Sequence, residues 1–149
     1  MIFTFLIFIM EEAIKNFAKQ FEYEPVIENA DKLGLPASTC ADRQTRDFEK
    51  YIVVGVGGSN LSTGLVKIIK PQKEIVVHRD YGLPFKDELL KESLIIASSY
   101  SGNTEEVVDA LNTAVEKNLN VAVLSMGGKL IELALQNSLP YIKVPDTGI

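Results

Sequence analysis

Residues 51–60 read YIVVGVGGSN, a short β-branched run that passes directly into a glycine-rich turn. The run is too short for a helix and is apolar on both faces, as strands buried in a parallel sheet are. The alternation of strand, turn and helix recurs to the end of the chain. It predicts an α/β fold in which helices cover both faces of a parallel sheet.

Nine regular elements are expected from residue 51 onwards. The strands are expected at 51–56, 74–78, 94–98, 120–124 and 140–144, and the helices at 59–70, 84–91, 104–117 and 128–136. Pro84 would lie in the first turn of the second helix. The third helix should bury one stripe, formed by Val107, Val108, Leu111, Ala114 and Val115. The common order 2-1-3-4-5 is the one expected for a five-stranded sheet of this kind.

The first nine residues, MIFTFLIFI, are almost wholly apolar. Glu11 and Glu12 interrupt this run long before the roughly 20 residues that a membrane-spanning helix needs. The run also lacks the positive start and the cleavage site of a signal peptide. We interpret residues 1–9 as an extension before a start at Met10, with a terminal strand or contact arm as the alternative.

Residues 10–50 precede the first strand and are more polar. An amphipathic helix is expected at 11–22, with Ala13, Ile14, Phe17 and Phe21 on one face. The remainder, with two prolines and a charged run, is expected to be a connection with room for one short helix. Residues 51–149 then form the main domain.

The chain of 149 residues has a formal net charge of −5, which argues against a nucleic-acid partner. An anion site must therefore be built locally from backbone N–H groups and hydroxyls. Because Cys40 is the single cysteine, neither an intrachain disulfide nor a thiolate metal cluster is expected, and a reducing cytoplasmic setting is favoured. The single histidine, His78, is expected to be an edge or surface residue rather than a catalyst.

Two turns carry the residues best suited to bind a ligand: 55–62 (GVGGSNLS) after the first strand and 98–104 (SSYSGNT) after the third. In the order 2-1-3-4-5 these turns flank the point where strand order reverses. Glycines let the backbone approach a ligand, and the first N–H groups of each following helix point outward. Together with the helix dipole and the hydroxyls, they could hold a phosphate without any lysine.

Other interpretations of these turns stay open. Asn103 with Glu106, and Ser59 in its own turn, could simply cap helices. The dinucleotide pattern G-x-G-x-x-G begins at Gly55, but Asn60 replaces its third glycine, which weakens this alternative without excluding it. The P-loop pattern is absent. Residues 127–129 (GGK) resemble a third anion turn, and a plain turn into a helix explains them equally well.

The motifs GVGGSN (55–60) and SSYSGNTEE (98–106) resemble the sugar isomerase, or SIS, domain. With DYGLP (80–84) and VPDTG (144–148), residues 50–149 are similar to the bifunctional phosphoglucose/phosphomannose isomerases. The resemblance implies a three-layer α/β/α sandwich, with residues 51–149 as the first of two SIS domains. It also implies a role in carbohydrate metabolism, at the shared steps of glycolysis and gluconeogenesis.

The reaction implied by the resemblance interconverts glucose 6-phosphate or mannose 6-phosphate with fructose 6-phosphate, without metal or nucleotide. By motif, Ser99, Ser101 and Thr104 would hold the phosphate, and Gly57, Gly58 and Ser59 would contact the sugar. Asn60 and Ser62 depart from the small apolar residues common in the family's glycine loop.

The isomerase reaction needs a base, and the two loops offer only neutral donors. In the family the base and acid lie in the second domain. We therefore expect the chain to require a second SIS domain or a homodimer partner for turnover. The alternative is a single SIS domain that binds a sugar phosphate as a non-catalytic or regulatory module. A stand-alone isomerase whose partner copy supplies the catalytic groups is a third interpretation.

Overall fold

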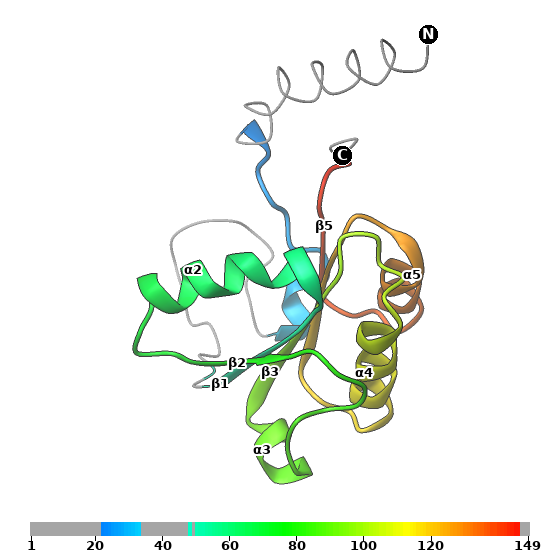
Figure 1. The fold of residues 1–149 in the computed structure, drawn as a ribbon. Helices are drawn as coiled ribbons and strands as arrows, with labels where there is room; N and C mark the ends of the chain where they lie inside the picture. Colours follow the sequence, from blue (N-terminus) through cyan, green and yellow to red (C-terminus); the bar gives the residue numbers. More distant parts are fainter. Residues whose placement is uncertain (1–21, 34–47, 49, 147–149) are drawn as a thin grey trace, which may run out of the picture.

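The structure is a computed structural model, and it describes residues 22–33, 48 and 50–146. Within these residues, five strands form one sheet in the order β2-β1-β3-β4-β5 (Figure 1). The strands are β1 Lys50–Val54, β2 Glu74–His78, β3 Ser93–Ser98, β4 Val121–Ser125 and β5 Tyr141–Lys143. Each neighbouring pair is parallel. The predicted α/β class and strand order are therefore confirmed.

The described helices follow the strands as expected. The α-helices are α2 Leu61–Ile69, α3 Asp87–Lys91, α4 Glu105–Glu116 and α5 Gly128–Gln136, and the 3-10 helices are η2 Ala30–Leu33 and η3 Gly57–Asn60. The predictions for α4 and α5 hold to within about a residue.

Two helix predictions need correction. The helix expected at 59–70 is divided, because the Asn60 side chain donates to the carbonyl of Gly55 and closes a tight 3-10 turn before α2 begins. The helix expected at 84–91 begins only at Asp87, so Pro84 lies outside it. The preceding loop is instead tied to α4, where the Gly82 N–H donates to the carboxylate of Asp109 at 2.8 Å.

One face of the sheet is closely packed by α3, α4 and α5. Its fully buried side chains include Ile52, Val54 and Ile95 from the strands, with Leu90, Val107, Leu111 and Leu130 from the helices. The predicted stripe of α4 is confirmed in Val107, Leu111 and Ala114; Ala110 joins it, and Val108 and Val115 are partly buried. Burial of each such leucine stabilises the fold by about 1.5–3 kcal/mol.

The opposite face is covered less completely, by α2 and by the η2 region (Figure 1). There, Leu33, Phe48 and Leu94 form a small cluster with Tyr51 and Ile96. Much of α2 itself remains in solvent, although its sequence is apolar. This face therefore retains accessible hydrophobic surface.

Residues 22–33 run beside the last strand. Tyr23 Oη donates to the carbonyl of Lys143 at 2.6 Å, and Glu28 pairs with Tyr141 in an antiparallel bridge. The predicted helix at 11–22, the apolar residues 1–9 and Cys40 lie outside the described residues, apart from Glu22. Among the helices that the structure describes, none is long and apolar enough to cross a membrane.

Candidate functional site

The two loops singled out from sequence meet at the carboxyl ends of β1 and β3. Ser98 Oγ lies 3.5 Å from the Ser59 carbonyl oxygen, to which it donates. A hollow of about 450 Å³ opens between the loops. It is lined by Gly58, Ser59, Ser62, Ser98, Tyr100, Leu124 and Val144. The predicted meeting of the two loops at the reversal of strand order is thus confirmed.

The glycine loop lies against the end of β3, and this close approach is possible because residue 55 has no side chain. A Cβ on Gly55 would lie 2.8 Å from the carbonyl oxygen of Ser98, closer than real Cβ atoms come. The Gly55 N–H donates to the carbonyl of His78 on β2 at 3.1 Å, and Asn60 is buried beneath the turn. These contacts leave Gly57 and Gly58 exposed and Ser59 half-buried beside the hollow.

The serine loop divides its hydroxyls between interior and surface. Ser99 is 3% exposed; its Oγ lies 2.7 Å from Thr104 Oγ1 and accepts the Gly102 N–H at 3.2 Å. Ser101 is exposed, and its Oγ accepts the Asn103 N–H at 3.3 Å. Thr104 is half-buried. Of the six predicted site residues, Gly58 and Ser59 line the hollow. Gly57, Ser99, Ser101 and Thr104 lie on the same two loops but are not among its lining residues.

Thr104 is the N-cap of α4, but its side chain makes no capping hydrogen bond to that helix. The first-turn amides of Glu105, Glu106 and Val107 have no carbonyl of their own helix to reach. The helix dipole places partial positive charge at the same point. This end of α4 therefore has the donors and the electrostatic bias to bind an anion.

The alternative in which Asn103 and Ser59 cap the helices that follow their own loops is wrong, because neither α4 nor α2 has a side-chain cap. Asn103 caps the neighbouring helix, because its Oδ1 accepts the Lys129 N–H of α5 at 3.2 Å while its Nδ2 donates to the Ser101 carbonyl at 3.3 Å. Ser59 lies within η3, and α2 begins after Asn60 with no side-chain cap.

The turn between β4 and α5 braces the serine loop from behind. Met126 N–H donates to the Tyr100 carbonyl, and Leu130 N–H donates to the Gly102 carbonyl, both at 3.0 Å. Ser125 Oγ lies 3.0 Å from the Gly127 carbonyl oxygen. The GGK run at 127–129 thus forms a turn into a helix and supports the shape of the serine loop.

Charged groups near the site lie mainly on the side of the loop after β2. Tyr81 Oη donates to Glu105 Oε2 at 3.2 Å. This hydrogen bond, and then the charge of the same carboxylate, raise the pKa of Tyr81. His78 Nε2 lies 3.3 Å from the Tyr81 carbonyl oxygen, so the histidine belongs to the edge of this loop. Of the described residues that line the hollow, none carries a carboxylate or an imidazole.

Known proteins with similar sequences are phosphosugar isomerases and a phosphosugar epimerase. No family model matches the chain. The chain is 32% identical, over 139 residues, to a bifunctional phosphoglucose/phosphomannose isomerase of Caldicellulosiruptor bescii. The alignment covers 91% of this chain and 38% of that relative. The chain is homologous to the bifunctional phosphoglucose/phosphomannose isomerases. A second isomerase of this name, from Thermoplasma volcanium, is 34% identical over 58% of the chain and 28% of the relative.

A relative with another activity also matches. A D-glucosamine-6-phosphate 4-epimerase of Sulfolobus acidocaldarius is 31% identical over 65% of the chain and 31% of its own length. The chain thus spans about a third of the length of these relatives. The described residues form a phosphosugar isomerase-like domain related to the phosphoglucose/phosphomannose isomerases.

Among solved structures, a NanR protein of Vibrio vulnificus aligns with 87% of the chain and 48% of its own, with a TM-score of 0.48 and 18% identity. The fold assignment rests on the strand order and not on this likeness.

Proposed function

We propose that this chain binds a hexose 6-phosphate, with the phosphate at the N-terminus of α4 and the sugar toward the glycine loop. The relatives named above are all named for phosphorylated hexoses, one of them a 6-phosphate, and an isomerase and an epimerase are both among them. What they share with this chain is therefore better explained by a common ligand class than by one reaction.

The observation that carries this proposal is the hydrogen bond between Ser99 and Thr104. Because Thr104 Oγ1 is engaged with Ser99 at 2.7 Å, it does not close the end of α4. The open first-turn amides, the neutral hydroxyls and the dipole suit a phosphate on a protein of net charge −5.

The six candidate residues then have distinct roles. Ser101 and Thr104 donate hydroxyl hydrogen bonds to the phosphate, beside the amides of the first turn of α4. Ser99, which is buried, orients the Thr104 hydroxyl and the Gly102 N–H. Gly57 and Gly58 let the backbone approach the sugar, and Ser59 adds a hydroxyl at the edge of the hollow.

In the complete reaction, the bound sugar phosphate is glucose 6-phosphate or mannose 6-phosphate exchanging with fructose 6-phosphate through an enediol. This chemistry needs a base and stabilisation of the enediolate. We propose that a second SIS domain, or a homodimer partner in the cytoplasm, supplies those groups. A non-catalytic sugar-phosphate-binding module is the second candidate, favoured by the neutral lining of the hollow.

Binding is tested by calorimetry with fructose 6-phosphate and, for comparison, fructose. Fructose 6-phosphate should bind and fructose should not, because the phosphate carries the recognition. Thr104→Val should weaken binding about tenfold or more, the loss of at least one charge-assisted hydrogen bond. Thr113→Val is the matched control, since the Thr113 hydroxyl donates to the Asp109 carbonyl on the same helix. Equal binding of both sugars, or equal losses in both variants, would refute the proposal.

Catalysis is a separate question with its own assay. Isomerisation of fructose 6-phosphate is measured with the chain alone and with a candidate second domain added. Turnover only in the mixture supports the incomplete isomerase. Binding without turnover in either case supports the regulatory module, and turnover by the chain alone contradicts the requirement for a partner.

A further inference from the structure

The first residue of α4 places a carboxylate beside the amides that are proposed to bind the phosphate. This residue is Glu105, and its side chain is exposed. The partial positive charge at the start of a helix attracts any anion, and the carboxylate of a first-turn residue is always close by. An unrestrained Glu105 would compete with a phosphate for the same amides and would repel it. A phosphate site at this end of α4 therefore needs the carboxylate to be held aside.

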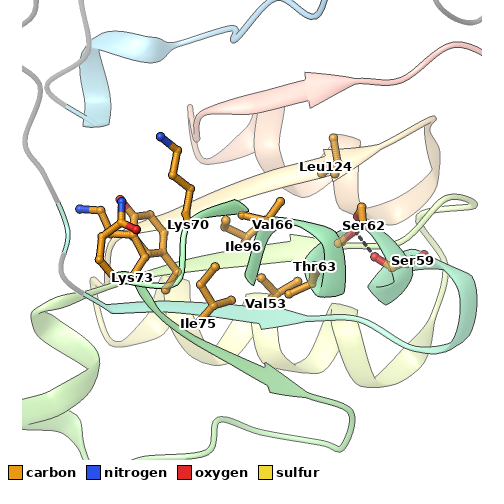
Figure 2. A pocket seen from close by; sticks show the side chains of 13 residues that line it. Val53, Ser59, Ser62, Thr63, Val66, Lys70, Lys73, Ile75, Ile96 and Leu124 are labelled. Atoms are coloured by element: carbon orange, nitrogen blue, oxygen red, sulfur yellow. Dashed lines mark hydrogen bonds between the residues drawn. The ribbon is translucent and has the colours of Figure 1, made fainter. Parts of the chain in front are cut away.

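The hollow offers no side-chain cation to offset that charge. Of the described residues that line it, none is a lysine or an arginine. Lys70 and Lys73 line the adjoining groove beside α2, but Figure 2 shows them at the end of the groove away from Ser59, which lines both the groove and the hollow. Binding by neutral hydroxyls and amides is therefore sensitive to the position of a single carboxylate.

Tyr81, in the loop after β2, holds the Glu105 carboxylate. Its Oη donates to Glu105 Oε2 at 3.2 Å. This hydrogen bond, and then the charge of the same carboxylate, raise the pKa of Tyr81, so the phenol stays protonated and remains a donor at neutral pH. The carboxylate is thereby directed toward the loop after β2, and the phosphate donors lie on the loop after β3.

The loop that carries Tyr81 is also anchored by contacts that do not involve the phenol. The Gly82 N–H donates to Asp109 Oδ2 at 2.8 Å, and Asp109 lies one helical turn after Glu105 on the same side of α4. The Tyr81 N–H donates to Asp80 Oδ1 at 2.8 Å. Because the tyrosine side chain is itself exposed, its hydroxyl can be removed without leaving a buried cavity or releasing the loop.

We propose that Tyr81 is a positioning residue for phosphate binding, whose hydroxyl holds the Glu105 carboxylate toward the loop after β2 and away from the N-terminus of α4. The amides at that end stay open to the ligand, while the charge of Glu105 still interacts favourably with the helix dipole. This inference rests on the proposed function and adds a residue that acts on the ligand only through Glu105. It gives a role to the aromatic residue of the DYGLP run at 80–84.

The test is a double-mutant cycle in which fructose 6-phosphate binding is measured by calorimetry. Tyr81→Phe should weaken binding about two- to fivefold, the range of an exposed charge interaction. Adding Glu105→Gln should restore binding to about the level of the unmodified chain, because the charge that Tyr81 positions is then absent. Glu116→Gln is the matched control: it removes a carboxylate at the opposite end of α4 and should leave the Tyr81→Phe defect unchanged.

Salt gives a second readout, which a purely structural role of Tyr81 would not change. In about 1 M sodium chloride the Debye length falls to about 3 Å, so repulsion between Glu105 and the phosphate is screened. The ratio of the dissociation constants of the Tyr81→Phe protein and the unmodified chain should then approach one.

The outcomes separate this inference from the proposed function. A Tyr81→Phe defect that persists in the Glu105→Gln chain, or at high salt, would overturn the inference, since the phenol would then act on the ligand or on the loop directly. Unchanged binding by Tyr81→Phe would overturn it as well and would leave the sugar-phosphate site standing. Failure of the unmodified chain to bind fructose 6-phosphate would refute the proposed function and this inference with it.

Discussion

Gly102 and Gly127 approach so closely that a methyl group on Gly102 would lie 1.8 Å from the Gly127 carbonyl oxygen. Gly102 also has a φ of +72°, in the left-handed region that favours glycine. The serine loop and the turn before α5 are thus fitted to each other through backbone atoms. The shape of the candidate phosphate site depends on this contact.

Gly102→Ala should therefore damage both the fold and the site. The added methyl must displace backbone, at a cost of about 1–3 kcal/mol in the free energy of unfolding. Fructose 6-phosphate binding should fall further than stability alone explains, because the loop shifts. Gly64→Ala is the control: Gly64 lies in α2 with open space around it, and this change should be neutral or stabilising. Denaturant unfolding and calorimetry report the two effects. An unperturbed Gly102→Ala protein would contradict the account of the contact.

Asn103 connects the serine loop to α5, and its two roles can be separated. Asn103→Ala removes the acceptor for Lys129 N–H and should lower the free energy of unfolding by about 1 kcal/mol. Asn103→Asp retains that acceptor and should keep most of the stability. Its carboxylate beside the phosphate should nevertheless weaken fructose 6-phosphate binding. Asn112→Ala, at an exposed position of α4, serves as the control. Tight binding by Asn103→Asp would argue against a phosphate at this loop.

High pH should weaken the attachment of the loop after β2 to α4, because it removes the hydrogen bond from Tyr81 to Glu105. The Glu105 hydrogen bond, followed by the charge of that carboxylate, raises the pKa of Tyr81 above its ordinary value of 10.0. Because the fold favours the protonated phenol, this contribution is fully present below pH 10 and is lost as pH rises through the raised pKa. Ultraviolet titration should show a late-titrating tyrosine that disappears in Tyr81→Phe, with Tyr100→Phe as the comparison. Persistence of the late component in Tyr81→Phe would show that the assignment is wrong.

The core predicted from helical spacing can be tested at Leu111. This side chain is fully buried between α4 and the sheet, and Leu111→Ala should cost about 2–5 kcal/mol in the free energy of unfolding. Leu135→Ala, at an exposed position, should change it by less than about 0.5 kcal/mol. Thermal or denaturant unfolding measures both. Similar losses in the two variants would contradict the described packing.

Much of the fold was predictable because the strands are short β-branched runs between clear turns. The strand predicted at 74–78 coincides with β2, and the stripe of α4 follows the 3.6-residue period. The meeting of the two loops could also be predicted, since the strand order fixes which loops share the reversal point. These features depend on local pattern and on one topological rule.

The rest depends on contacts between residues far apart in sequence. The capping of α5 by Asn103 joins residues 26 positions apart, and the Tyr81–Glu105 hydrogen bond joins residues 24 apart. The local sequence pattern instead predicted that Asn103 caps α4, the helix that follows it. In the sequence, the DYGLP run at 80–84 carries only a family resemblance, and no local pattern predicts its hydrogen bond to α4 through Gly82 and Asp109. Burial of Ser99 likewise follows from the packed loop and not from its motif.

An NMR titration of the ¹⁵N-labelled chain with fructose 6-phosphate tests whether the serine loop and the start of α4 bind a sugar phosphate. We predict saturable shifts that are largest at the amides of residues 101–106, with smaller shifts at 57–59 and little response to fructose. Such a pattern would place the phosphate on the serine loop and the first turn of α4. Saturable shifts centred elsewhere, or no shifts at millimolar ligand, would contradict the claim that this loop is a sugar-phosphate site.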